Sequence, residues 1–395
     1  MLLEFIVFGA WFATLGLVHA THHLNAIIGK AYLLSAIAAI LSPLLLGAIG
    51  DRYLAPRTLL GLSHLVGACV LLAVPHAIAT HNSALTLGLI FAYMIGFQPT
   101  LGLVNTVALS TLKDNRAVFP YVRVFASIGW VVAGLAVGAV GYSASTAVFY
   151  VAAVTSVVLG LYAFSLPAGQ VRVQFARLSF GDLIGIHAFV LFRERSFTVL
   201  MICALMTSIS LGIYNSFASP YLAVLGIRDV AGVLALGQIS EVAFIITIPW
   251  VLKRIGMKWA LLCGMAMWGV RFLLFIDAAR GAVASAIVGV LLHGICADYF
   301  IVIAAMYIAE IASRNLAAQA QNWLILVVSG FGQAIGSGVA GAVYSSTIMP
   351  RAHLGPQAWT QLWLVPVVLA TATTIVWVLF FRPAPGTTVA AGHTA

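Results

Sequence analysis

Charged residues are scarce in this chain of 395 residues: they make up 7% of it, whereas apolar residues make up 63%. An ordinary soluble domain carries roughly 25% charged residues, because its surface must be hydrated. The mean hydropathy of +1.09 is equally far from that of a soluble protein. These values exclude a soluble enzyme and a disordered regulator. They predict an all-α protein whose surface faces lipid.

Cysteine is also rare, with 4 residues that all lie in apolar runs and show no paired spacing. That pattern excludes a disulfide framework and a CxxC metal site, so we expect no bound metal. A positively charged region is missing ahead of the first apolar run, where Glu4 is the only early charge. A cleaved signal peptide begins with such a region. We therefore expect residues 2–20 to be a retained membrane span.

Basic residues outnumber acidic ones, 19 to 10, which gives a net charge of +9. They do not cluster, so we expect no nucleic acid partner. Thirteen of the nineteen Lys and Arg fall in the even-numbered gaps between apolar runs or in the tail, against four in the odd-numbered gaps (Lys30, Arg228, Arg280 and Arg351). Lys and Arg stay on the cytoplasmic side during insertion. The count predicts a multi-pass protein of the bacterial cytoplasmic (inner) membrane with both termini in the cytoplasm.

Apolar runs of about 18 or more residues, each long enough to cross a bilayer as a helix, fill most of the chain. They predict twelve transmembrane helices, at residues 2–20, 28–50, 58–79, 84–110, 118–141, 145–166, 197–224, 231–252, 258–278, 283–311, 318–346 and 360–381. The layout predicts two six-helix bundles, at 1–166 and 197–381, joined by a cytoplasmic central loop at 167–196. Residues 382–395 are expected to be a disordered cytoplasmic tail. Such an arrangement favours a binding site between the bundles near the bilayer midplane.

Glycines recur along one side of two of these spans. They are Gly129, Gly134, Gly138 and Gly141 in the fifth span, and Gly332, Gly336, Gly338 and Gly341 in the eleventh. Small residues let helix backbones approach closely, so we expect these spans to pack against helices of the opposite half. The alternative is the general enrichment of glycine in membrane helices.

Polar residues inside the fifth span form one face. Arg123, Ser127 and Trp130 are separated by four and three residues, which places a guanidinium, a hydroxyl and an indole on the same side of a helix. A charged residue in hydrocarbon costs about 2.5 to 3.5 kcal/mol on insertion scales, so it indicates a functional site. This face could hold a planar polar ligand by hydrogen bonds and stacking. The alternative is that Arg123 pairs with a carboxylate on a neighbouring helix.

Two carboxylates lie at membrane depth in the second half. Glu241 shares a helix face with Gln238, and Asp298 precedes Tyr299 in the tenth span. Because a carboxylate removed from water is costly in its charged form, such groups can take up and release protons near neutral pH. They could couple proton flow to transport. A purely structural pairing with Arg123 or Arg271 is the alternative.

Buried amides supply further candidates for ligand contacts. Gln98 and Asn105 lie on either side of Pro99 in the fourth span, and Asn215 precedes Pro220 in the seventh. Proline interrupts helices where backbone groups can line a cavity, so neighbouring amides are candidate contacts. An interhelical hydrogen bond is the alternative for each of them.

Several histidines and one arginine have a less specific pattern. His19, His22 and His23 have helical spacing that could bind a metal or sense pH, but the lack of an acidic or cysteine partner favours a solvated loop. His293 could tune the proton affinity of Asp298 or could be a packing histidine. Arg271 is interpreted as structural.

Five segments of the sequence resemble a known transporter family. The run from Gly47 to Asp51 and Arg52, closed by Arg57, is similar to the loop signature between spans 2 and 3 of the major facilitator superfamily. Four further segments resemble the nucleoside:proton symporter family within that superfamily: Pro99–Thr106, Phe119–Arg123, Gln238–Pro249 and Trp268–Phe275. The similarity covers the twelve spans nearly without gaps.

This resemblance implies the major facilitator fold and import of a nucleoside by proton symport, through a central site reached alternately from either side. It implies no enzyme activity, no cofactor beyond the proton gradient, and function as a monomer in the lipid bilayer. The ligand contacts it implies are Arg123, Ser127 and Trp130 from the first half, and Asn215, Gln238, Glu241, Asp298 and Tyr299 from the second. Asp298 and Glu241 are the proton-coupling candidates.

The sequence departs from the resemblance at three positions. Gly212 stands where the best-known members have a ligand-contacting Gln on span 7, and Ser127 and Trp130 stand where they have Thr and Phe. A carrier for another small polar solute, such as a sugar or a cell-wall fragment, or a drug exporter therefore stays open. A membrane enzyme acting on lipids would need a catalytic cluster near an interface, and none is evident. A transport-inactive sensor is a third alternative.

Overall fold

The computed structural model of this protein describes residues 1–112, 118–167, 186–313 and 316–382, without the side chains of 43–53 and Pro120. Within these ranges every regular element is a helix, and there is no strand. Helices satisfy their own backbone hydrogen bonds, which is what a chain surrounded by lipid requires. The predicted all-α class is confirmed.

Ten stretches of the described residues are long and apolar enough to cross a membrane. Two of them contain a non-helical break: Val230–Ala279 at Gly256, and Ala317–Phe380 at Arg351 and Gly355. Gly256 has φ 73° and ψ 169°, a conformation that glycine adopts without steric cost. Dividing the two stretches at their breaks gives the twelve spans predicted from hydropathy.

Contacts divide the chain into two compact units. Unit 1 comprises Met1–Arg177, Asn215–Ala235 and Ser337–Gly341, and unit 2 comprises Leu178–Tyr214, Leu236–Gly336 and Ala342–Ala395. Unit 1 therefore contains the first six predicted spans together with short pieces of three later helices. The bundle boundaries given by the sequence stay a prediction.

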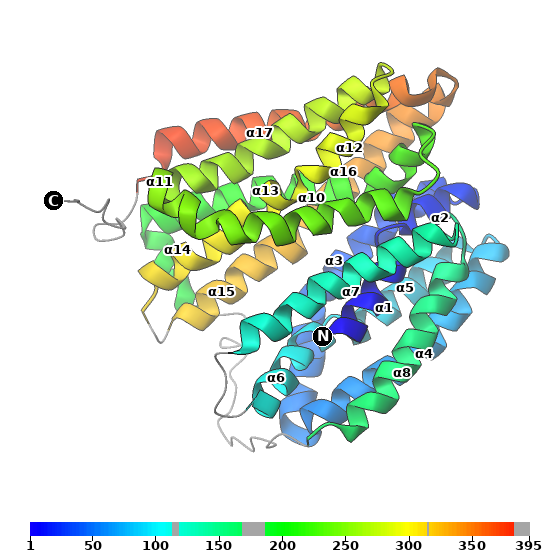
Figure 1. The fold of residues 1–395 in the computed structure, drawn as a ribbon, viewed down its shortest axis with the longest axis horizontal. Coiled ribbons are helices and arrows are strands. Elements are labelled where there is room, and N and C mark those ends of the chain that lie inside the picture. The colour runs from blue at the N-terminus through cyan, green and yellow to red at the C-terminus, as the bar shows by residue number, and fades with distance from the viewer. Residues whose placement is uncertain (113–117, 168–185, 314–315, 383–395) are drawn as a thin grey trace. The chain divides into compact units, whose positions relative to one another are not determined.

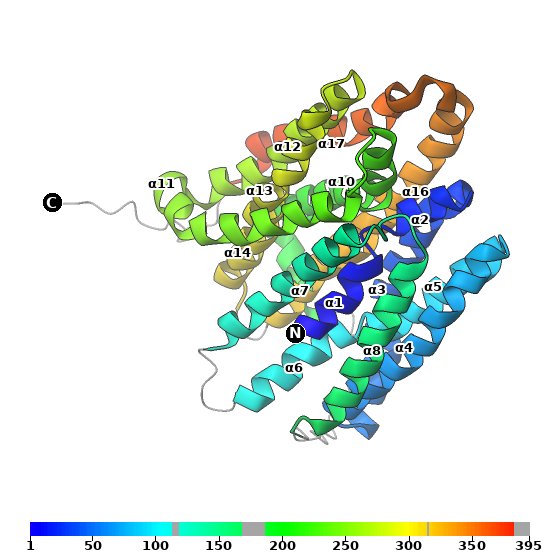
Figure 2. The same ribbon diagram turned by 45° about the vertical axis from the view of Figure 1, so that its right-hand side comes forward.

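The described residues of the first half of the sequence form nine successive helical elements of unit 1 (Figure 1). They are α1 (Leu2–Trp11), α2 (Leu15–Thr21), η1 (Asn25–Ile27), α3 (Ile28–Tyr53), α4 (Pro56–Ala79), α5 (Ser83–Phe97), α6 (Thr100–Leu112), α7 (Phe119–Ala139) and α8 (Ala147–Ser165). Helix α4 lies between α5 and α8, and α1 packs on α7 and α8, as the turned view in Figure 2 also shows. Helix α1 is thus an inner helix of this unit.

Local sequence explains where several of these helices begin and end. Pro56 starts α4, at a position whose N–H would have no partner within the helix. The Asn82 side chain caps α5 by accepting a hydrogen bond of 2.9 Å from the Leu85 N–H. The fourth span is interrupted at Gln98 and Pro99, between α5 and α6, as the proline predicts.

Unit 2 contains most of the remaining elements, apart from the parts of α10, α11 and α16 that belong to unit 1. They are η3 (Ile186–Arg193), α10 (Arg195–Val224), α11 (Val230–Ala279), α12 (Val283–Leu291), α13 (His293–Ala297), η4 (Asp298–Val302), α14 (Ile303–Ile311), α15 (Ala317–Ile325), η5 (Leu326–Gly332), α16 (Gln333–Val343), η6 (Tyr344–Ile348), η7 (Met349–Trp359) and α17 (Thr360–Phe380). Elements η4, η5 and η6 are π-helical segments. π-helical turns inside α-helices are frequent at functional sites.

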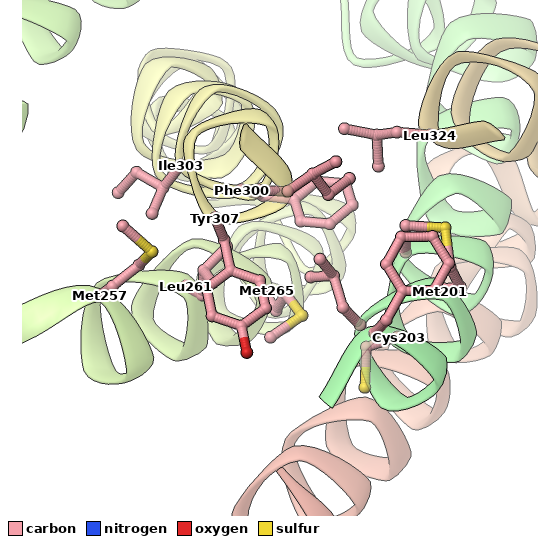
Figure 3. Packing of buried hydrophobic residues seen from close by; sticks show 14 of the residues in the cluster. Met201, Cys203, Met257, Leu261, Met265, Phe300, Ile303, Tyr307 and Leu324 are labelled. Atoms are coloured by element: carbon pink, nitrogen blue, oxygen red, sulfur yellow. The ribbon is translucent and has the colours of Figure 1, made fainter. Parts of the chain in front are cut away.

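Methionine and aromatic side chains fill the core of unit 2. Met257, Leu261 and Met265 of α11 pack with Phe300 of η4 and Tyr307 of α14, all 8% exposed or less (Figure 3). Lipid tails are as apolar as these side chains, so close van der Waals packing rather than the hydrophobic effect holds such helices together. Unbranched methionine side chains can adapt their shape to the residues that they pack against.

Three glycines of the two predicted stripes bring later helices against the first half, within unit 1. A Cβ atom on Gly134 would lie 2.9 Å from the Cβ of Ala235 in α11, and one on Gly138 would overlap the Asp229 carboxylate. A Cβ on Gly341 of α16 would lie 3.3 Å from the Cα of Gly29 in α3. At these positions the predicted close approach between the halves is confirmed.

The other glycines of the stripes do not contact the opposite half. Gly129 lies against Leu2 and Phe5 of α1, while Gly332 and Gly336 lie against α10. A Cβ atom on Gly141 or Gly338 would meet no atom of another helix within 4 Å. For these five positions the prediction of packing across the halves is wrong, because the glycine-bearing face of each helix turns toward more than one neighbour.

One further expectation is corrected by the helices, and the bounds of the central loop stay a prediction. Helix α10 runs through Pro220 without an interruption, so this proline does not break the seventh span. The predicted central loop contains a helical element, η3, at Ile186–Arg193. Residues 168–185 of that loop and the tail from 383 lie outside the described residues.

Candidate functional site

The candidate site in unit 2 begins with two residues on one face of α11. The Nε2 of Gln238 donates a hydrogen bond of 3.4 Å to Oε1 of Glu241. The Glu241 side chain is 22% exposed, so it is largely removed from water while part of it stays accessible. The predicted shared face of Gln238 and Glu241 is therefore present.

His293, the first residue of α13, is the second partner of Glu241. Its Nε2 lies 3.1 Å from Oε1 of Glu241. Helix α13 reaches α11 because Gly294 has no side chain: a Cβ there would lie 2.5 Å from backbone atoms of Ser240 and 2.8 Å from the Glu241 nitrogen. The hydroxyl of Ser240 accepts a hydrogen bond of 2.9 Å from the Gly294 N–H and fixes this approach.

Arg271 completes a polar chain that ends in the interior of unit 2. This side chain is fully buried, and its Nη1 lies 2.7 Å from Nδ1 of His293. Arginine only donates hydrogen bonds, so Nδ1 must be the acceptor and Nε2 must carry the imidazole proton, which it donates to Glu241. Arg271 thus donates a hydrogen bond to His293, and His293 donates one to the carboxylate of Glu241.

Aromatic rings hold the Arg271 guanidinium in place. Its Cζ lies 3.5 Å from the ring centroid of Tyr214 and 5.2 Å from that of Trp268. The Tyr214 ring also stacks on His293, with centroids 5.6 Å apart. Stacking on aromatic faces stabilises a desolvated guanidinium by about 2 kcal/mol. Nε and Nη2 of Arg271 have no hydrogen-bond partner among the described residues.

Asp298 occupies the first position of the π-helical element η4. The residue is 6% exposed, and its Oδ2 atom has no hydrogen-bond partner within the described ranges. A buried charge without a partner is strongly unfavourable. This carboxyl group is therefore placed where gaining or losing a proton changes the local free energy substantially.

Tyr299, the next residue, lies in the hydrophobic core of unit 2 and is 6% exposed. Its hydroxyl is 2.6 Å from the hydroxyl of Thr247 in α11, and its ring meets Phe244 edge-on. The predicted role of Tyr299 in ligand binding stays a prediction.

The predicted residues of α7 belong to unit 1 and face outward from its core to different extents. Arg123 is exposed, while Ser127 and Trp130 are partly buried. The indole of Trp130 meets the ring of Phe8 in α1 edge-on, with centroids 5.0 Å apart. Arg123 makes no ion pair with a described carboxylate. The proposed face of α7 thus has the exposed Arg123 at one end and Trp130, which packs on α1, at the other.

The predicted amides are also partly buried. Asn105 uses its Nδ2 to donate a hydrogen bond of 3.0 Å to the Leu101 carbonyl of its own helix. Gln98 lies at the interruption between α5 and α6, and Asn215 lies in α10, in the piece that belongs to unit 1. Their ligand contacts stay predictions.

The predicted loop motif between spans 2 and 3 is mostly helical. Gly47, Asp51 and Arg52 lie in α3, which continues to Tyr53, and their side chains are outside the described residues. Arg57 lies in the first turn of α4 and donates a hydrogen bond of 2.5 Å from Nη1 to the Leu166 carbonyl. Arg57 therefore joins the start of α4 to the end of α8.

Sequence reasoning offered a direct pairing of a carboxylate with Arg271 as an alternative, but it missed that His293 lies between Arg271 and Glu241. The only available signal was the presence of three ionisable residues in three apolar runs. Their pairing depends on the crossing of α11 and α13, which single-sequence patterns do not encode. His19 was expected in a solvated loop, but it lies in α2 and is fully buried. No group of three or more possible metal ligands exists among the described residues.

Comparison with known proteins settles the family. The family model described as nucleoside H+ symporter matches residues 1–385. The chain belongs to the nucleoside H+ symporter family. The protein YegT of Escherichia coli K12 is 30% identical over 97% of this chain and 92% of its own length. The xanthosine permease of the same organism is 29% identical over 92% of this chain and 90% of its own length.

Solved structures agree with this family and with the fold. The crystal structure of the nucleoside transporter NupG matches with a TM-score of 0.85 at 26% identity, over 96% of this chain and 97% of NupG. A D-xylose–proton symporter shares the fold with a TM-score of 0.72 at 13% identity, over 96% of both chains. Members of the family are transporters rather than enzymes, which confirms the class predicted from the sequence.

Proposed function

We propose that this protein imports nucleosides across the inner membrane of a bacterium, driven by protons that move inward with them. The observation that carries this proposal is the buried chain of Arg271, His293, Glu241 and Gln238. A chain of this kind is what a carrier needs to bind a polar solute at membrane depth. Membership of the nucleoside H+ symporter family gives the substrate class and the coupling ion.

Glu241 is proposed to bind the sugar. Both of its hydrogen bonds fall on Oε1, and Oε2 has no partner among the described residues. Ribose hydroxyls donate hydrogen bonds, and a carboxylate oxygen accepts them. The hydrogen bond from His293 keeps the carboxylate in one orientation, and Arg271 in turn fixes the tautomer of His293. Gln238 offers its amide oxygen as a second acceptor on the same face.

Trp130 is proposed to stack on the base. Its indole is partly exposed and packs at right angles to the ring of Phe8 in α1, which restricts its orientation. A nucleobase is planar, and stacking on an aromatic side chain contributes about 1 to 3 kcal/mol. Ser127 and Arg123 lie on the same face of α7 and are proposed to donate hydrogen bonds to polar atoms of the base. Asn105, Gln98, Asn215 and Tyr299 are proposed as additional contacts.

Asp298 is proposed to carry the coupled proton. In the proposed cycle a proton from outside joins its carboxylate, the two bundles rock, and the proton leaves to the cytoplasm with the nucleoside. A buried carboxylate without a hydrogen-bond partner is costly, so proton binding removes that cost and favours the next step. Glu241 is the second proton-coupling candidate, because its own protonation would weaken the hydrogen bond from His293.

We also propose that the chain functions as a monomer in the lipid bilayer, with both termini in the cytoplasm and no cofactor other than the proton gradient.

Uptake into proteoliposomes tests the proposed function. Purified protein is reconstituted, and radiolabelled uridine and adenosine are supplied with and without an inward proton gradient. Accumulation above the external concentration, present only with the gradient, is the expected result. Equal internal and external concentrations under a gradient would contradict coupling, and a lack of flux in folded protein would contradict the substrate class.

Another small polar solute is the second candidate substrate, favoured by the environment of Gly212. A Cβ on Gly212 would lie 2.7 Å from the Gln333 carbonyl oxygen and 2.8 Å from its Cα. Helix α10 thus packs backbone to backbone on α16, and a glutamine at position 212 would not fit. A panel of unlabelled nucleosides, sugars, cell-wall fragments and drugs, each competing with labelled uridine, decides between the candidates.

A further inference from the structure

A second buried ionisable pair lies in unit 1, apart from the carboxylates of unit 2. Oε2 of Glu4, in α1, is 2.8 Å from Nε2 of His64, in α4. The two residues are 0% and 2% exposed. No described Lys or Arg forms an ion pair with Glu4. The family resemblance and the proposed transport cycle assign nothing to this pair.

The pair lies deep in the unit. Because a helix rises about 1.5 Å per residue, His64 is about 12 Å from the start of α4 at Pro56. Hydroxyls from two more helices complete the site: Ser156 of α8 is 3.3 Å from His64 Nδ1, and Thr100 of α6 is 2.5 Å from Glu4 Oε1. Four helices therefore meet at one ionisable group, where an unmatched charge would be costly.

The hydrogen bonds around the pair suit two protonation states. The Thr100 hydroxyl has one proton and two acceptors in reach, Glu4 Oε1 at 2.5 Å and the Phe97 carbonyl at 2.6 Å. It can donate to an ionised Glu4, or donate to Phe97 and accept from a protonated Glu4. The Ser156 hydroxyl likewise can donate to a neutral His64 or accept from the Nδ1–H of a charged one. In both states the two ring nitrogens of His64 and the two carboxyl oxygens of Glu4 keep a hydrogen-bond partner.

We propose that Glu4 and His64 form a second proton-binding site of this symporter, whose ionisation sets part of the pH dependence of uptake. This proposal rests on the proposed function. The other titratable groups facing Glu4 from the described elements are the Met1 amino group and the Tyr93 hydroxyl of α5. Helices α6 and α8 contribute only hydroxyls. Because the pair is sealed from water, it exchanges its proton only when these helices move, which links its ionisation to the transport cycle.

The test is the pH profile of nucleoside uptake in proteoliposomes. Glu4→Gln keeps the size of the side chain and one acceptor oxygen, replaces the second oxygen with an NH2 donor, and removes one ionisation. The limiting slope of log uptake rate against pH counts the protons involved, and it is expected to fall by about one. Nucleoside accumulation is expected to be retained at the optimal pH. The exposed Glu310 supplies the matched control: Glu310→Gln is expected to keep the profile of the wild type. A Glu4→Gln profile that superimposes on the wild-type profile would overturn the proposal.

A milder variant covers the case in which Glu4→Gln does not fold. Ser156→Ala removes the acceptor for the Nδ1–H of a charged His64, so proton binding is disfavoured and the profile is expected to move to lower pH. A purely structural pair predicts a loss of thermal stability with an unmoved profile. That result would also refute the proposal.

Infrared titration of the purified protein separates this proposal from the proposed function. The wild type is expected to show a titrating buried carboxyl band that is absent from Glu4→Gln, whether or not nucleosides are transported. If Glu4→Gln does not fold, Ser156→Ala is used in its place, and the band is then expected to titrate at lower pH than in the wild type. A band that does not titrate in the wild type, or that is unchanged by these variants, would contradict the proton site even if uptake is proton-driven.

Discussion

In the unit 2 site, the position of the proton on His293 determines which hydrogen bonds its neighbours make. Because Arg271 donates to Nδ1 of His293, the imidazole is fixed as the tautomer that donates to Glu241. Protonating His293 would break its hydrogen bond to Arg271. We infer that His293 orients the carboxylate, while the carboxyl groups of Glu241 and Asp298 change protonation.

Replacing Arg271 tests this arrangement. Lysine keeps the charge but cannot both lie flat on Tyr214 and donate to His293, because it lacks the planar fork of arginine. In Arg271→Lys we expect nucleoside affinity to fall on the order of tenfold, since the orientation of Glu241 is lost. Equilibrium binding of labelled nucleoside to purified protein measures it. Arg280→Lys, at an exposed position, is the control, and equal affinity in both variants would contradict the role of Arg271.

Replacing the carboxylates separates coupling from binding. In Asp298→Asn the side chain cannot ionise, so gradient-driven accumulation is expected to fall by at least about tenfold while exchange of internal for external nucleoside continues. In Glu241→Gln we expect both activities to fall, because the acceptor of the ribose hydroxyl is lost. Accumulation and counterflow are measured in the same vesicles. Full proton-dependent accumulation in both variants would exclude this assignment.

At the scale of helices, glycine and serine decide which side chains meet. Gly294 lets α13 approach the backbone of α11, and the Ser240 hydroxyl bonds the two helices at that point. His293 is adjacent to this contact, so its distance to Glu241 follows from the approach. The close packing of α10 on α16 at Gly212 similarly removes space that a longer side chain would need.

Gly294→Ala tests the dependence of the site on helix approach. The added methyl group would lie 2.5 Å from backbone atoms of Ser240, so α13 must move away from α11. We expect a loss of about 1 to 3 kcal/mol in stability, seen as a lower Tm by fluorescence-monitored unfolding in detergent, and weaker nucleoside binding. The matched control is Gly88→Ala in α5. There the added methyl group would meet nothing within 4 Å, so the Tm should not fall. A Tm equal to that of the wild type for Gly294→Ala would show that the contact is loose.

At the scale of the whole molecule, the distribution of charge predicts the orientation in the membrane. Thirteen Lys and Arg in alternate gaps against four in the others predict cytoplasmic termini. The division into two units adds that unit 1 includes Asn215–Ala235 and Ser337–Gly341, from the second half of the sequence. Close contacts at Gly134, Gly138 and Gly29 pack these pieces against helices of the first half within unit 1.

Reporter fusions test the orientation. A fluorescent protein at the C-terminus is expected to be fluorescent, and alkaline phosphatase at the same place inactive, because the tail stays in the cytoplasm. A truncated fusion after Ser143, beyond the fifth span, should give the reverse pattern. Active phosphatase at the C-terminus would require an inverted or odd-numbered topology.

The sequence by itself determined the membrane class, the number of spans and the set of ionisable residues at membrane depth. These follow from local composition, since the cost of placing a charge in lipid belongs to each residue and the length of an apolar run belongs to each span. The family followed from motifs within single segments. Glu241, Gln238 and Asp298 could be selected as candidate site residues from the same local patterns.

Only the tertiary structure decided which of these residues are partners. Glu241 pairs with His293, which is bonded in turn to Arg271, and Glu4 pairs with His64 across 60 positions of the chain. Such pairs depend on which faces of which helices cross, and the crossing depends on small residues such as Gly294 at a single point. A hydropathy pattern is nearly the same for every face of a lipid-embedded helix, so it does not specify these crossings.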